Sequence, residues 1–147
     1  MTTRIWKAEP MTVALERWEA TLIGHLGIEV VEAGDDYLTA RMPVDERTRT
    51  PAGVLHGGAS VALAETVATW AANCCVEPTR QECVPFDSNA HHLRTVVDGR
   101  VQALARPLHL GEAAQVWEVQ ITGERRPEMV ICVARVTLVV RDVPHWH

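Results

Sequence analysis

The segment formed by residues 57–76 constrains the fold of this chain more than any other. It is predicted to be a helix that is apolar on nearly every side, with one carboxylate, Glu65, near its middle. Glu77 and Pro78 stop it. The stretch is long enough to resemble a membrane span, but His56 and Glu65 interrupt it. A helix that is apolar all round must be enclosed by other elements, so we expect it at the centre of the molecule.

The rest of the chain is predicted to be one short helix and six strands. The expected helix covers residues 13–25 and is capped by Thr12. Alternation of apolar and polar side chains predicts a hairpin over residues 28–42 and strands over 84–93, 99–105, 117–121 and 130–140, with a loop at 107–111. This order indicates a single α+β domain, residues 1–147, in which an antiparallel sheet wraps around one helix. Such a sheet leaves edges and one face to be covered, which favours a homo-oligomer.

Composition narrows the choice of partners and compartment. The 147 residues carry a net charge of −5, which disfavours binding to nucleic acid or to an anionic membrane. The four cysteines show no CxxC spacing, and the first ten residues do not form a signal peptide. We therefore expect a reduced, cytoplasmic protein.

Glu65 and the glycines ahead of it are the strongest indication of chemistry. Burying a carboxylate in an apolar helix is costly, and proteins keep such a group mostly where it reacts or has a fixed partner. Gly57 and Gly58 leave the first amides of the helix uncovered, which suits a carbonyl oxygen or an oxyanion. A shielded carboxylate beside amide donors can hydrolyse an activated acyl group. The alternative is a structural carboxylate paired with a buried arginine or histidine.

Two further residues belong to this hypothesis. Thr69 lies one turn after Glu65 and could hydrogen-bond the carboxylate or a water molecule. His56 could orient the substrate; alternatively, it is a capping histidine that fixes the loop. No HExxH motif or paired ligand spacing accompanies the histidines, so no metal site is predicted.

The ordered motifs of the chain carry a resemblance that spans nearly its whole length. They are Met42-Pro43-Val44-Asp45, Leu55-His56-Gly57-Gly58-Ala59-Ser60-Val61, Leu63-Ala64-Glu65, Pro107-Leu108-His109-Leu110-Gly111 and Val116-Trp117-Glu118. With them, the chain resembles the hotdog-fold thioesterases of the phenylacetate-pathway type. The resemblance implies a hotdog fold, dimers or tetramers with the active site between subunits, and hydrolysis of aryl-CoA or medium acyl-CoA. It implies no cofactor, because coenzyme A is part of the substrate.

The resemblance also implies residue roles. Glu65 matches the nucleophile or general base, Gly57 the amide that polarises the thioester carbonyl, His56 a histidine beside that carbonyl, and Thr69 a nearby hydroxyl. The residues that match substrate- or CoA-contacting positions are Pro85, His92, Arg94, His109, Leu110 and Gly111.

One departure affects the site. The family's glutamine before the Pro-x-Gly loop is Thr50 here, and the aromatic residue that normally follows the proline is Ala52. Threonine is shorter and is expected to place the substrate carbonyl less well. Two other functions on the same scaffold remain open: a non-catalytic acyl-CoA or acyl-carrier binder, and a hydratase or dehydratase.

Overall fold

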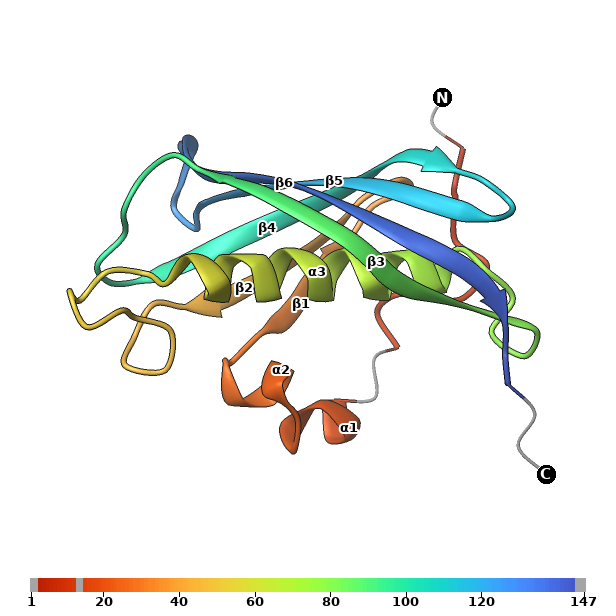
Figure 1. The fold of residues 1–147 in the computed structure, drawn as a ribbon, viewed down its shortest axis with the longest axis horizontal. Helices are drawn as coiled ribbons and strands as arrows, with labels where there is room; N and C mark the ends of the chain where they lie inside the picture. The colour runs from red at the N-terminus through yellow and green to blue at the C-terminus, as the bar shows by residue number, and fades with distance from the viewer. Residues whose placement is uncertain (1–2, 13–14, 145–147) are drawn as a thin grey trace.

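The computed structural model describes residues 3–12 and 15–144 and consists of one long helix against one curved sheet (Figure 1). Two short helices precede the long one. The helices and strands are α1 Leu15–Glu19, α2 Leu22–His25, β1 Glu29–Ala33, β2 Leu38–Pro43, α3 Gly57–Cys74, β3 Gln81–His92, β4 Arg100–Leu110, β5 Ala114–Gly123 and β6 Arg126–Asp142. The six strands are antiparallel in the order β1-β2-β4-β5-β6-β3. The predicted α+β hotdog architecture is confirmed.

The core lies between α3 and the concave face of the sheet. Small residues on α3, chiefly alanines, let the helix approach the strands closely, and Leu63 and Val67 fill the space between them. Alternate residues of each strand point inward; Trp117, Ile121 and Leu138 have no exposed surface. This period-2 burial is the pattern on which the predicted strands rest.

The N-terminal segment crosses the sheet and then closes the C-terminal end of α3. The Trp6 ring stacks on Trp117 at a centroid distance of 6.3 Å, and its indole N–H donates to the Gly34 carbonyl at 2.7 Å. The backbone amides of Lys7 and Ala8 both donate to the carbonyl of Cys74, the last residue of α3. The last carbonyls of a helix have no donor within the helix, so they need donors from another segment.

The single helix predicted over residues 13–25 is wrong. The chain forms two short helices instead, α1 and α2, of which α2 folds back on α1. A Cβ at Gly24 would lie 2.5 Å from the Trp18 carbonyl oxygen, so the close return requires glycine. Thr12 donates its hydroxyl to the Glu9 carbonyl, which closes a turn, and residues 13–14 lie outside the described chain.

The loop predicted at residues 107–111 is also wrong, because β4 continues to Leu110. The register between β4 and β5 shifts between Pro107 and His109. Proline has no N–H to give to a sheet, and a bulge accommodates it without ending the strand. The turn of this hairpin follows at residues 111–113.

The sheet does not enclose α3 on every side. Val61, Glu65 and Trp70 are half-buried on the face turned away from the core. One curved sheet can cover only one side of a helix, so this face stays open in a single chain. No helix in the described part of the chain is long and apolar enough to cross a membrane.

All four cysteines are free and buried, which gives a direct test of the fold. Burial raises the pKa of Cys74 and Cys75 to about 12 and that of Cys83 to about 11, and it also raises the pKa of Cys132. The thiols are therefore protonated at pH 8, where an unperturbed cysteine is partly thiolate. We predict that a chromogenic disulfide reagent at pH 8 modifies the native protein slowly, and modifies all four thiols at once in denaturant. Fast labelling of the native protein would contradict this packing.

Candidate functional site

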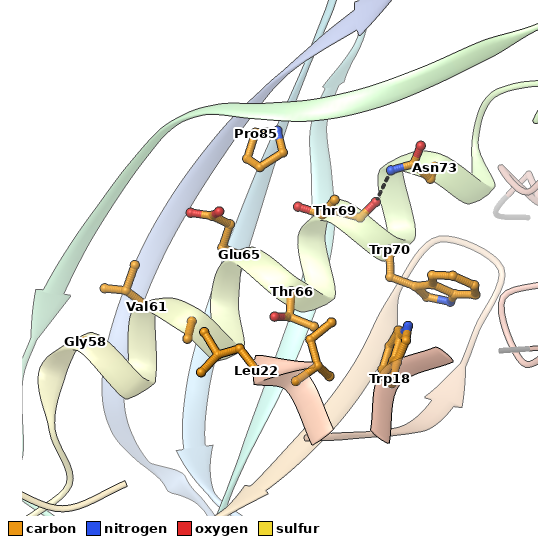
Figure 2. Close-up of a pocket in the computed structure, with 12 residues that line it drawn as sticks. Trp18, Leu22, Gly58, Val61, Glu65, Thr66, Thr69, Trp70, Asn73 and Pro85 are labelled. Carbon is orange, nitrogen blue, oxygen red and sulfur yellow. Dashed lines mark hydrogen bonds between the residues drawn. The ribbon is translucent and has the colours of Figure 1, made fainter. Parts of the chain in front are cut away.

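A cavity of about 640 Å³ lies over the open face of α3, between this helix, the α1–α2 segment and β3 (Figure 2). Its walls are mainly apolar, and one carboxylate projects into it. The residues that line it are Trp18, Leu22, Ile23, Gly58, Val61, Ala62, Glu65, Thr66, Thr69, Trp70, Asn73 and Pro85. Three residues predicted for the site, Glu65, Thr69 and Pro85, are thus brought together.

The Glu65 side chain is half-buried and points towards β3 (Figure 2). Its Oε2 atom accepts a hydrogen bond of 3.0 Å from the Ser88 hydroxyl. Within the described residues, no lysine, arginine or histidine lies at salt-bridge distance from Glu65. The described residues of one chain therefore give no support to the alternative of a structural carboxylate with a buried cationic partner.

The far end of the cavity is formed by two tryptophans. Trp18 and Trp70 pack edge to face with ring centroids 5.5 Å apart. The Trp70 indole N–H donates to the Pro10 carbonyl at 2.8 Å, so the N-terminal segment holds this ring in place. An edge-to-face pair fixed in this way makes a rigid apolar wall.

Thr69 does not bind Glu65. Its hydroxyl oxygen is buried and has no hydrogen-bond partner in the described structure. Its carbonyl accepts instead from the Asn73 amide at 2.8 Å (Figure 2). Asn73 also donates to the Cys83 carbonyl and accepts from the Cys83 amide, which joins α3 to β3. The predicted contact of Thr69 with the carboxylate is therefore not formed in this structure.

His56 is the N-cap of α3. Its Nδ1 atom accepts from the Gly58 amide at 2.7 Å, which confirms the capping interpretation. Since Nδ1 accepts, the ring hydrogen of the neutral imidazole is on Nε2, where it can be donated to another group. The Gly57 amide has no acceptor among the residues that the structure describes, as expected at a helix start.

His92 lies over the same helix start. A Cβ at Gly57 would lie 3.0 Å from its Nε2 atom, so glycine leaves just enough room for the imidazole. Arg94 and His92 both line a shallow depression of about 560 Å³, which is separate from the main cavity. The helix start, His92 and Arg94 thus form one continuous region.

The other predicted contacts lie elsewhere in the single chain. His109, Leu110 and Gly111 are at the β4–β5 hairpin, and the last two line a depression with Cys75 and Val76 at the opposite end of α3 from His56. Thr50 lies in a turn, where its hydroxyl accepts from the Ala52 amide at 3.2 Å, and it does not line the main cavity.

Sequence reasoning did not identify Ser88, Asn73 or the tryptophan pair as parts of the site. The register of β3 shifts between Pro85 and Asp87, so residues on both sides of this bulge can face the same way. No sequence pattern shows that shift. In residues 3–12 and 15–144, no group of three potential ligands is arranged to hold a metal ion.

Comparison with known proteins shows the family. Residues 52–130 match the Thioesterase superfamily. The chain belongs to this superfamily. It is 42% identical to 1,4-dihydroxy-2-naphthoyl-CoA hydrolase of Escherichia coli, over 92% of this chain and 98% of that one. It is 45% identical to the proofreading thioesterase EntH of Cronobacter turicensis, over 82% and 88% of the two chains. Its enzyme class is that of the thioester hydrolases, and the predicted family is confirmed.

Solved structures agree with this assignment. Thioesterase HI1161 of Haemophilus influenzae superimposes with a TM-score of 0.87 at 43% identity, covering 97% of this chain and 99% of that chain. The Staphylococcus aureus protein SAV0944 has been solved as a glutamate-to-alanine and as a glutamine-to-alanine variant, whose substituted positions lie 15 residues apart. It is 30% and 31% identical to this chain in the two structures, with TM-scores of 0.79 and 0.77, over 84% and 82% of this chain and 100% and 98% of the other. The same spacing separates Thr50 from Glu65.

The cap at the start of α3 gives a prediction about stability. Replacing His56 with alanine removes the acceptor for the Gly58 amide and should lower the free energy of unfolding by about 0.5–2 kcal/mol. His56→Asn keeps a side-chain acceptor and should lose less. Urea unfolding of the three proteins measures the difference; equal stability of the alanine variant would show that the cap contributes nothing.

Proposed function

We propose that this protein is a cytoplasmic acyl-CoA thioesterase that uses Glu65 as general base or nucleophile and the Gly57 amide as oxyanion donor. The observation that carries this is a carboxylate in an apolar cavity, with no cationic partner in residues 3–12 and 15–144, on a helix whose first amide has no acceptor among those residues. The spacing shared with the two substituted positions of SAV0944 supports the choice of Glu65.

The helix start supplies the electrostatic part of the reaction. The Gly57 amide and the positive end of the α3 dipole stabilise charge on the thioester carbonyl oxygen. His56, the residue before Gly57, carries a second donor on its Nε2 atom. Amides held by a helix need no reorganisation as the negative charge develops.

Glu65 can act by two routes with the same outcome. As general base it takes a proton from water while the water oxygen bonds to the carbonyl carbon. Collapse of this intermediate breaks the C–S bond, and the proton passes from Glu65 to the departing thiolate. As nucleophile, Glu65 bonds to the carbonyl carbon and expels the thiolate, and water then hydrolyses the anhydride. Both routes require an ionised carboxylate with one accessible oxygen.

The shape of the cavity favours an aryl or medium-length acyl group. Glu65 and Trp70 are five residues apart on α3, a rise of about 7.5 Å. The rigid pair of Trp18 and Trp70 ends the cavity at that point. The distance suits one aromatic ring or a short alkyl chain. Thr66 and Thr69 add hydroxyl groups to an otherwise apolar wall.

We assign the coenzyme A portion to the region outside the helix start. His92 and Arg94 extend from Gly57, and an exposed arginine suits phosphate oxygens. His109, Leu110 and Gly111 cannot join them within one chain, because they lie at the other end of α3. In a homodimer or homotetramer they would come from another subunit. Pro85 and Thr50 would contact the acyl end and its entrance.

Two features of the single chain favour assembly. Strand β3 is 12 residues long and is an edge of the sheet, and Phe86 on it is 74% exposed. An uncovered edge of this length is a template for pairing with another chain. A second copy beside β3 would also shield the open cavity, which that strand borders.

The function is tested by offering the protein a panel of aryl-CoA and aliphatic acyl-CoA thioesters and measuring the release of free thiol. Glu65→Ala should lower turnover by about 10²- to 10⁴-fold, the range of a general acid–base contribution. Product CoA should still bind. Wild-type activity in the variant would refute the role of Glu65, whereas CoA binding without turnover by the wild type would favour the non-catalytic binder.

Sedimentation velocity tests the assembly. The wild type should be a dimer or tetramer, and Phe86→Asp, which puts a charge on the edge, should shift it towards monomer and lower turnover. Val31→Asp is a matched control at the opposite edge, on β1, and should change neither. A fully active wild-type monomer would exclude a site shared between subunits.

A further inference from the structure

The Glu65 carboxylate accepts one hydrogen bond from the residues that the structure describes. Of the donors in the described residues, only the Ser88 hydroxyl contacts its carboxylate, at 3.0 Å from Oε2. The Thr69 hydroxyl, one turn away on the same helix, has no hydrogen-bond partner in the part of the chain that the structure describes, and it does not reach the carboxylate. A carboxylate can accept several hydrogen bonds, so Oε1 remains available to water or substrate.

Ser88 itself is held firmly. It lies within β3, in register with Val136 of β6. Two hydrogen bonds between the Asn73 side chain and the backbone of Cys83 connect this strand to α3, and a third holds the Asn73 amide on the Thr69 carbonyl of its own helix. The strand and the helix that carry the two partners are therefore fixed relative to each other. A hydroxyl on such a frame can set the orientation of the carboxylate.

The loop before α3 does not supply a polar side chain that holds the Glu65 carboxylate as Ser88 does. The Thr50 hydroxyl accepts a hydrogen bond from Ala52 in its own turn and does not line the cavity. This is the position that lies 15 residues before Glu65, where SAV0944 has a glutamine. Among the described residues, the hydroxyl that hydrogen-bonds the carboxylate comes from β3 instead.

We propose that Ser88 is a positioning residue for the hydrolysis: its hydroxyl fixes Oε2 of Glu65, so that Oε1 faces the thioester. This deepens the proposed function and rests on Glu65 being the reactive group. While the hydroxyl hydrogen is donated to Oε2, the hydroxyl oxygen keeps lone pairs that can accept from the attacking water. Ser88 thus acts on the carboxylate and neither gains nor loses a proton overall.

The sharpest test compares two variants of the same shape. Ser88→Thr keeps a hydroxyl and Ser88→Val replaces it with a methyl group, so folding effects of the added volume are shared. We expect kcat of Ser88→Thr to exceed that of Ser88→Val by about 10- to 100-fold, the effect of one hydrogen bond to a charged group, with similar KM. Ser88→Ala should behave like Ser88→Val.

Controls separate this inference from the proposed function. Thr137→Val removes a hydroxyl from β6, the strand next to β3, and should keep wild-type kcat. Equal kcat for Ser88→Thr and Ser88→Val, with Glu65→Ala inactive, would overturn the role of Ser88 alone. Full activity of Glu65→Ala would overturn the proposed function. A change confined to KM would also contradict positioning, because an oriented carboxylate acts on the transition state.

Discussion

The rest of the structure depends on how α3 is covered. The helix is apolar on most of its surface, and the concave sheet covers one side of it, with alanines that allow close packing. The opposite side carries Glu65 and stays open above the sheet edge. One packing constraint therefore both builds the core and leaves a lined cavity beside a carboxylate. The uncovered side of α3 also favours association with a second copy.

Three of the predicted site residues, His56, Gly57 and His92, meet at the start of the same helix. His56 caps the helix through its Nδ1 atom and thereby presents its other ring nitrogen as a donor, while Gly57 has a free amide under the His92 ring. Glu65 follows two turns later, within the cavity. Gly57 and Glu65 are eight residues apart, a rise of about 12 Å, so the helix fixes their separation within one chain. The N-terminal segment adds the closing wall through Trp18 and Trp70.

The central helix, the sheet and the place of Glu65 on that helix could be predicted from the sequence, because they rest on periodicity and on one charge in an apolar segment. Ser88 could not, since the bulge after Pro85 alters which residues of β3 face the helix. The sequence also could not show that the Thr69 hydroxyl lacks a hydrogen-bond partner in the described structure, because this depends on side-chain geometry. The place of His109 could not be predicted either, because it depends on β4 continuing to Leu110 past the bulge at Pro107.

The most direct test is a crystal structure of Glu65→Gln with bound benzoyl-CoA. We predict the thioester carbonyl oxygen within hydrogen-bond distance of the Gly57 amide of one subunit, with the phenyl ring against Trp70 and the substituted amide side chain supplied by another subunit. Two subunits are needed because Gly57 and Trp70 of one chain are separated by a rise of about 20 Å along α3. A thioester bound away from the start of α3, with the cavity between Trp18 and Pro85 empty, would contradict the proposed site.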